Sequence, residues 1–182
     1  MAVQKKIYNT EAFEQFIDLP ENADRLFEFI GGDVVEVPSN PYSSSIGGWF
    51  LTFINLFLLK NPIGHTTGEA GLYSVFGERY APDVGYISKA HQPELARRGP
   101  NPNPPDLAIE VISPTDNTRD VSIKLSNYLA AGTVVWVVYP DEQQVVVHSP
   151  GQPAQIVNID GVLHGGDVLP GFTLPLRDVF AR

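Results

Sequence analysis

Two short segments of the chain carry a carboxylate within the pattern of a buried strand. Glu110 is the one polar residue in the segment 107–112, whose five remaining residues are all apolar. Asp83 stands at the start of a second short strand pattern, 82–87. Ionised carboxylates are almost never buried unless they are paired or bind a metal. Two of them on neighbouring strands would form a site for a hard cation such as Mg²⁺, which prefers oxygen ligands.

Such a cation site suits the hydrolysis of a phosphodiester bond. This reaction needs a cation to neutralise charge on the phosphoryl oxygens and a water that is activated near neutral pH. Lys124 follows the Glu110 strand on the next predicted helix, and it is the best candidate to position or deprotonate this water. Glu28, between two phenylalanines in another strand pattern, could complete the acidic cluster. We therefore predict four catalytic residues, Glu28, Asp83, Glu110 and Lys124.

Each of these residues also has an ordinary structural interpretation. Asp83 could cap a turn after Pro82, and Glu110 could belong to a buried ion pair. Lys124 could form an exposed salt bridge with Asp120, four residues earlier on the helix, worth a few tenths of a kcal/mol. Glu28 could be a solvated residue of a hairpin.

Further polar residues are weaker candidates. Asp106 shares a face with Glu110 by strand parity, but capping of the strand start is the favoured interpretation. The pair Arg97-Arg98, with Lys89, lies in a long loop and could contact phosphates or be solvated. The histidines lack the paired spacing of a zinc site.

The elements that must position these residues alternate between helices and strands. A hairpin is expected over 25–30 and 33–37 with its turn at Gly31-Gly32, because two glycines suit a tight turn. A capped helix with Thr10 as its N-cap is expected over 10–18, ended by Pro20, and Gly132 is expected to end the helix 117–131. The other expected elements are a polar loop 38–45, a central helix 46–60, strands 64–67 and 71–76, a long loop 88–104, a turn 113–116, strands 133–138 and 145–148, one or two short strands in the tail, and a terminal helical turn 175–180. This order predicts an α+β or mixed α/β fold.

The length of 182 residues favours one domain spanning residues 1–182. The formal net charge of −9 argues against a protein that coats nucleic acid, since such binding depends on Lys and Arg. It is compatible with a nuclease whose acids hold cations and whose few basic residues line one groove. No apolar run approaches the length of a membrane span and no signal sequence is evident, so we expect a cytoplasmic protein without a membrane.

The succession of motifs resembles a known family. After a glutamate in the hairpin come Gly-Asp-Val-Val-Glu (32–36), Pro-Asp-Val (82–84) and Pro-Asp-Leu-Ala-Ile-Glu-Val-Ile-Ser-Pro (105–114). An Arg-Asp pair, Lys124 and Tyr-Leu-Ala-Ala-Gly (128–132) follow, then a strand with a tryptophan and a late Pro-Gly-Phe. From about residue 13 to residue 180 the chain resembles the restriction-endonuclease-like Uma-two family, a branch of the PD-(D/E)XK nuclease superfamily.

The resemblance implies a mixed sheet flanked by helices, with the acids at one sheet edge. It implies that Asp83 and Glu110 bind Mg²⁺, or Mn²⁺, together with the backbone carbonyl of Val111. The superfamily lysine usually stands two residues after the glutamate, where this chain has Ile112. In the Uma-two family it moves to the next helix, which matches Lys124. The substrate implied is DNA, and a homodimer is expected because cutting two strands requires two active sites.

Two departures from the family pattern leave another function open. A histidine often found before the central helix is replaced by serines in residues 41–45. The strand 132–140 lacks the glutamate and the aspartate that the family carries there. The alternative is a catalytically inactive relative that acts as a binding or oligomerisation module. A metal-dependent hydrolase of another phosphate ester is a third possibility.

Overall fold

The computed structural model describes residues 9–37 and 40–181. Within these residues, the helices are α1 (Thr10–Ile17), α2 (Pro41–Lys60), α3 (Thr118–Ala130) and α4 (Arg177–Phe180), with a 3-10 turn at Pro20–Asn22. The strands are β1 (Phe27–Ile30), β2 (Asp33–Glu36), β3 (Gly64–Gly68), β4 (Tyr73–Val75), β5 (Glu78–Tyr80), β6 (Val84–Ser88), β7 (Leu107–Val111), β8 (Val134–Tyr139), β9 (Gln144–His148), β10 (Gln155–Asn158), β11 (Val162–His164) and β12 (Thr173–Pro175).

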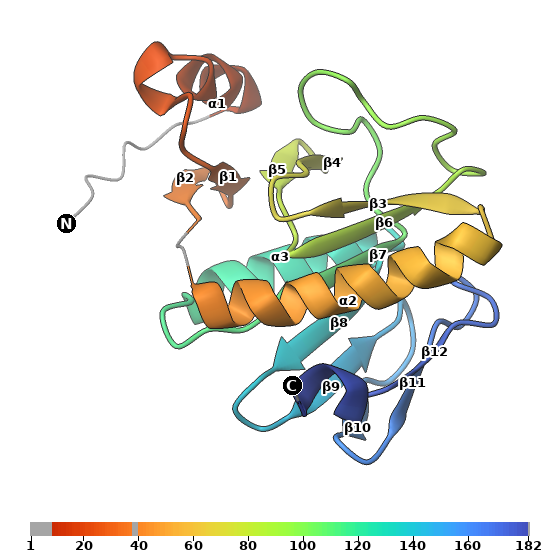
Figure 1. Ribbon diagram of the computed structural model, residues 1–182. Coiled ribbons are helices and arrows are strands. Elements are labelled where there is room, and N and C mark those ends of the chain that lie inside the picture. The colour runs from red at the N-terminus through yellow and green to blue at the C-terminus, as the bar shows by residue number, and fades with distance from the viewer. Residues whose placement is uncertain (1–8, 38–39, 182) are drawn as a thin grey trace.

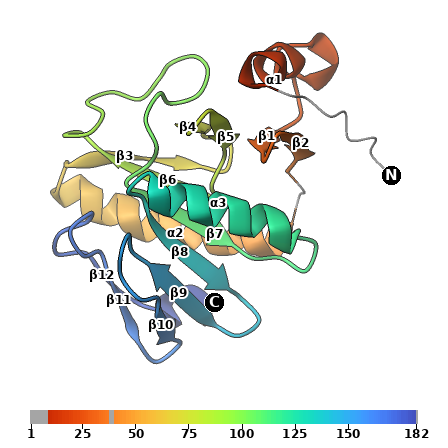
Figure 2. The same cartoon turned by 180° about the vertical axis from the view of Figure 1, so that it is seen from behind.

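A six-stranded sheet in the order β10-β9-β8-β7-β6-β3 forms the centre of the molecule. Its β7 and β8 are parallel, and its other neighbouring strands are antiparallel. A smaller sheet has the order β2-β1-β5-β4, and β11 pairs with β12. Helix α2 crosses one face of the central sheet (Figure 1), and α3 covers the opposite face (Figure 2). The predicted mixed sheet flanked by helices is confirmed.

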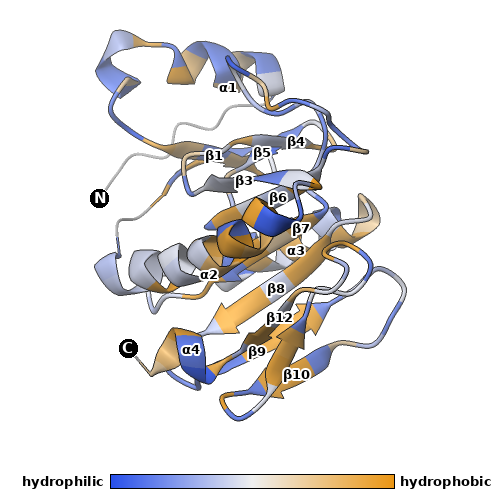
Figure 3. Ribbon diagram, turned by 45° about the vertical axis from the view of Figure 1, so that its right-hand side comes forward, coloured by the Kyte–Doolittle hydropathy of each residue, from blue (hydrophilic) through white to orange (hydrophobic). Residues whose placement is uncertain are grey.

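Strand β7 divides the core into two halves by the alternation of its side chains. Leu107, Ile109 and Val111 belong to the hydrophobic cluster under α2, whereas Ala108 belongs to the cluster under α3. Glu110 has the parity of Ala108, so it points towards α3. The neighbouring strand β8, and β9 beyond it, are coloured as hydrophobic over most of their length (Figure 3). A carboxylate is thereby held at the boundary between an apolar sheet and a helix.

Helix α2 begins five residues earlier than the sequence predicted. We expected a polar loop up to Ser45, but the helix starts at Pro41. The Asn40 side chain accepts hydrogen bonds from the amides of Tyr42 and Ser43, and Pro41 occupies the first turn, where a missing N–H costs nothing. The three serines therefore lie in the helix, and Ser43 is buried.

Helix α2 also corrects the expectation that no segment approaches a membrane span. It is 20 residues long, and by length and composition it is apolar enough to cross a membrane. In this fold, however, Ile46, Phe50, Ile54 and Leu58 are buried in the core cluster under the sheet. A central helix of a folded domain passes the same test, and this packing accounts for the apolar composition.

The remaining differences are local. The N-cap of α1 is Asn9, which accepts a hydrogen bond from the amide of Ala12, so the predicted cap at Thr10 is wrong by one residue. Gly31 and Gly32 have φ values of 58° and 84°, which confirms the predicted hairpin turn. Strand β5 was not predicted, and the tail contains three short strands where one or two were expected. The terminal helical turn is present as α4.

Candidate active site

Antiparallel pairing brings Asp83 and Glu110 together. Strands β6 and β7 pair Val84 with Ile109, so the residues one step further along, Asp83 and Glu110, stand opposite each other. The Asp83 side chain accepts a hydrogen bond from the Val111 amide, with 2.7 Å between Oδ2 and N. Both strands are interior members of the central sheet. The acids therefore lie where two central strands end, rather than on one of the sheet's outer strands.

Lys124 joins two of the predicted acids directly. Its Nζ lies 2.8 Å from Oε2 of Glu110 and 2.9 Å from Oε1 of Glu28. The three side chains are 8–16% exposed. The alternative partner, Asp120, forms an ion pair with Arg119 instead, at 3.6 Å. The interpretation of Lys124 as one half of an exposed helix salt bridge is therefore wrong.

Glu28 reaches this cluster because the smaller sheet packs over the end of the central one. Its Oε1 also accepts a hydrogen bond from the amide of Ala81, at 2.7 Å, just before the Asp83 position. Glu28 is 6% exposed, which excludes the solvated hairpin residue considered above. One carboxylate thus links the hairpin, the segment before β6 and, through Lys124, helix α3.

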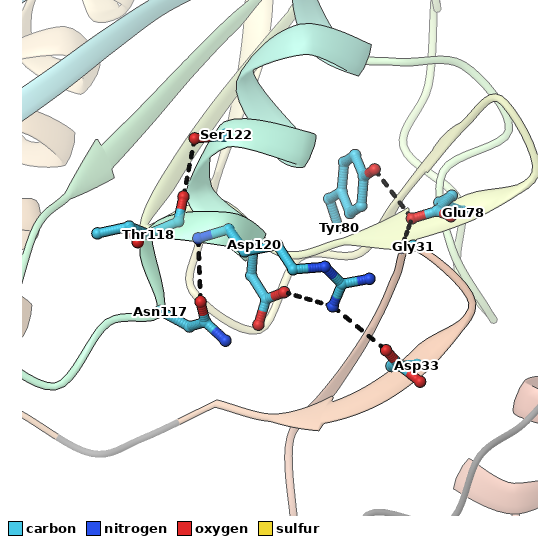
Figure 4. Close-up of polar contacts among 9 residues, drawn as sticks. Gly31, Asp33, Glu78, Tyr80, Asn117, Thr118, Asp120 and Ser122 are labelled. Carbon is cyan, nitrogen blue, oxygen red and sulfur yellow. Dashed lines mark hydrogen bonds and ion pairs between the residues drawn. The ribbon is translucent and has the colours of Figure 1, made fainter.

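Further polar contacts fix the hairpin against β5 and α3 (Figure 4). Glu78 accepts hydrogen bonds from the Gly31 amide, at 2.6 Å, and from the Tyr80 hydroxyl, at 3.0 Å. The Arg119 guanidinium lies between Asp33 of the hairpin and Asp120 of the helix. These contacts hold the element that carries Glu28 in one position relative to Lys124.

The charges at this site do not balance. Three carboxylates and one ammonium group leave a surplus of two negative charges in a poorly solvated place. Burial raises the pKa of Asp83 to about 6, since its hydrogen bond from Val111 and the charge of Lys124 offset the desolvation only in part. Burial likewise raises the pKa of Glu110, and the neighbouring acids Glu28 and Asp83 add to this effect.

Lys124 responds in the opposite sense. Burial alone would lower the pKa of its ammonium group, but the charges of Glu110 and Glu28 outweigh burial and raise it. The lysine is therefore firmly protonated in this arrangement. It can stabilise negative charge, but it is poorly suited to remove a proton from water.

The Glu110 carboxylate is poorly satisfied for a buried group. Its Oε2 accepts from Lys124. The Tyr128 hydroxyl interacts with this carboxylate, but neither that hydroxyl nor Oε1 of Glu110 makes a hydrogen bond of good geometry within residues 9–37 and 40–181. A poorly satisfied buried acceptor is costly, and beside the second carboxylate of Asp83 it is compatible with a divalent cation.

The donor set for such a cation is small. No cluster of three or more His, Cys, Asp or Glu side chains suited to a metal occurs in the described part of the chain. Mg²⁺ usually takes one or two carboxylates and retains several waters, so Asp83 and Glu110 meet its requirement. Val111 lines the same cleft and its amide already binds Asp83, which leaves its carbonyl as the predicted third ligand.

A cleft of about 350 Å³ opens over these residues, lined by all four predicted catalytic side chains. Other polar residues that the sequence did not assign to a site also line this cleft, among them Ser43, Glu69, Asp116 and Asp120. Asp120 carried a usable signal, because it lies one helical turn before Lys124 and hence on the same face. Ser43 could not be assigned to the cleft from the sequence, because its position depends on α2 starting at Pro41.

Other candidates lie away from the cleft. Asp106 accepts hydrogen bonds from the Ser88 amide and binds the ring of His91, which supports the capping interpretation. Arg97 and Arg98 are exposed on the long loop. That loop is ordered by a buried amide, since Asn101 Oδ1 accepts hydrogen bonds from Gln92 and from the Ala96 amide.

A central mixed sheet flanked by helices, with two carboxylates where its strands end and a lysine from the helix packed beside them, defines a restriction-endonuclease-like protein. The Uma2 family model, described as "Putative restriction endonuclease", matches residues 13–177, and the chain belongs to this family. The fold is also that of a "putative nuclease belonging to DUF820" from Anabaena variabilis. That structure has a TM-score of 0.78 and 23% identity, over 92% of this chain and 96% of the other. A search of curated proteins finds no match.

Proposed function

We propose that this protein is a Mg²⁺-dependent endonuclease that hydrolyses phosphodiester bonds in DNA. The family supports a nuclease-like activity. The observation that carries the metal dependence is the pair Asp83 and Glu110, two buried carboxylates that stand opposite each other where β6 and β7 end. Mn²⁺ has similar ligand preferences and should replace Mg²⁺.

The side chains divide the chemistry among them. When bound, Mg²⁺ would neutralise charge on the phosphoryl oxygens and lower the pKa of a bound water. Asp83 and Glu110 would hold the cation, with the Val111 carbonyl as a further ligand. Lys124, kept protonated by its two glutamates, would stabilise the negative charge that develops on the phosphate. Glu28 would position Lys124 and does not need to touch the substrate.

A thermal melt tests the metal site independently of activity. Mn²⁺ should stabilise the wild type, by about 2.7 kcal/mol at a concentration of 100 times the Kd. Glu110→Gln should abolish this response, whereas Asp141→Asn, at an exposed site, should preserve it. The same three proteins should then be incubated with supercoiled and linear DNA, with Mg²⁺ and with EDTA.

Cleavage by the wild type and by Asp141→Asn, absent in Glu110→Gln, would support the proposal. Folded wild-type protein that gains stability from Mn²⁺ but leaves every form of DNA intact would refute the nuclease. No metal response in any of the proteins would favour the inactive binding module. We further propose that the active form is a homodimer, which sedimentation at several protein concentrations would test.

A further inference from the structure

The basic residues of this acidic protein are distributed in a way that the fold does not require. The described residues include nine Lys and Arg side chains. Five of them form ion pairs with carboxylates, namely Arg25, Arg79, Arg119, Lys124 and Arg177. The other four are exposed and have no acidic partner within the described residues, namely Lys60, Lys89, Arg97 and Arg98.

These four unpaired residues, the basic cluster, gather around one end of the molecule. Lys60 ends α2, and the amide of Lys89 donates to the carbonyl of Ile63, three residues after that end. The His65 ring contacts the carbonyl of Pro93, which ties the loop that carries Arg97 and Arg98 to β3. Acidic residues here are few. Glu94 is exposed on the loop, and Asp106 is occupied by His91.

A row of hollows leads from the active-site cleft towards this end. The cleft, of about 350 Å³, is followed by two hollows between α2 and β3 with volumes of about 180 and 630 Å³. The first two share Ser44, Glu69 and Asp83, and the second and third share Leu51. Leu95 of the long loop lines the far side of the third hollow. Figure 1 shows α2 and β3 running side by side along this path.

A glycine in the groove is unexplained by packing. Gly48 lines the second hollow, and a Cβ there would have no heavy atom within 4 Å. Glycine inside a helix is destabilising relative to alanine, so the fold alone favours a larger residue. Neighbouring Gly47 differs, because its Cβ would lie 3.4 Å from Cβ of Asp83. An open glycine on a groove wall is typical of a place where another backbone approaches closely.

We propose that a DNA strand lies in the groove between α2 and β3, with its distal phosphates on the basic cluster. This inference rests on the proposed function, because it places the phosphate to be cut over Asp83 and Glu110. Thirteen residues of α2 separate Gly47, beside Asp83, from Lys60, which is roughly 20 Å at 1.5 Å per residue. Phosphates of one strand recur about every 3.4 Å, so the basic cluster contacts the strand about six nucleotides from the cut.

The experiment measures DNA affinity against salt concentration in EDTA, so that cleavage and Mg²⁺ competition are both absent. In the cluster variant, all four residues of the basic cluster are replaced by alanine. In the matched control, the ion-paired, exposed Arg25 and Arg177 are replaced by alanine. Each lost duplex phosphate contact lowers the slope of log K against log salt by about 0.9. We expect the magnitude of this slope to fall by up to about 3.6 in the cluster variant and to change little in the control.

A second variant tests the groove without altering charge. Gly48→Leu should keep the Mn²⁺ response, because a Cβ at this position has no heavy atom within 4 Å, and it should weaken DNA binding at every salt concentration. Gly48→Ala is the matched control and should raise the melting temperature with a smaller effect on affinity. If both the cluster variant and Gly48→Leu bind DNA with unchanged affinity and slope, the groove is not the DNA surface.

Other outcomes separate this inference from the proposed function. If the wild type cuts DNA and the cluster variant has an unchanged KM, the proposed position of DNA in the groove is refuted but the nuclease activity is not. A wild type that binds through the basic cluster but never cuts overturns the nuclease alone. Wild type that neither binds nor cuts overturns both. A cluster variant that loses self-association, with no change in DNA affinity, identifies the surface as an interface between copies of the chain.

Discussion

Replacing Asp83 by asparagine should stabilise the metal-free protein at neutral pH. The pKa of Asp83 is about 6 in the fold and 3.8 as an ordinary value. Between these two pH values the unfolded chain releases the proton while the folded chain keeps it. The free energy of unfolding therefore falls as the pH rises from about 4 to about 6, and it stays low above that. Asparagine does not ionise and removes this loss.

The magnitude follows from the difference between the two pKa values, which is about 2. At about 1.36 kcal/mol for each pKa unit, ionised Asp83 costs up to about 3 kcal/mol. The hydrogen bond that it accepts from the Val111 amide is retained, since an asparagine Oδ1 can accept from the same N–H. For a domain of this size the stabilisation corresponds to a rise in Tm of about 6–12 °C.

The assay is urea unfolding in EDTA at pH 4, 5, 6, 7 and 8, for wild type and for Asp83→Asn. The variant should match the wild type at pH 4 and exceed it by an increasing margin up to about pH 7. Asp141→Asn, at an exposed site, should show no such divergence. If Asp83→Asn is less stable than wild type by the same amount at every pH, then Asp83 is a structural carboxylate and the cation-site reasoning fails.

Four further substitutions test the same geometry. Lys124→Met should cost about 3–5 kcal/mol at pH 7 in urea unfolding, because it leaves two buried carboxylates without their cation; a loss below 1 kcal/mol would contradict the buried arrangement. Tyr128→Phe should cost less stability than Tyr80→Phe, because the buried Tyr128 hydroxyl interacts with Glu110 without a hydrogen bond of good geometry, whereas Tyr80→Phe should cost about 1 kcal/mol through its hydrogen bonds with Asn127 and Glu78. Gly31→Ala should lower Tm in a thermal melt by several degrees, since φ is +58° there and a Cβ would lie 2.9 Å from Ile123; an unchanged Tm would show that the hairpin packs loosely on α3.

The sequence predicted the two central acids because a carboxylate is unusual within the apolar pattern of a buried strand. Glu110 stands in an apolar run, and no surface interpretation satisfies its neighbours. The opposition of Asp83 and Glu110 could not be predicted in the same way, since it depends on the register of β6 against β7. Register is set by the whole sheet and by the long loop between the two strands.

The partner of Lys124 was harder to predict for a physical reason. The local rule for helices points to Asp120, four residues earlier, and that contact requires no tertiary structure. In the fold, both side chains are buried, and Glu28 and Glu110 lie closer to the ammonium group. Lys124 thus pairs with two residues distant in sequence instead of with Asp120. This pairing could be found only once the position of the hairpin over the sheet was known.

Charge balance also predicts an order of events at the two ends of the groove. When the carboxylates of Glu28, Asp83 and Glu110 are all ionised, they exceed the charge of Lys124 by two, which one divalent cation would cancel, and the cleft holds further acids in Glu69, Asp116 and Asp120. Without that cation the cleft repels the phosphate backbone, whereas the basic cluster attracts it with or without metal. DNA should therefore bind the far end of the groove in EDTA and should enter the cleft only once the cation is bound. Metal and DNA would then strengthen each other's binding by the same factor, as linkage requires.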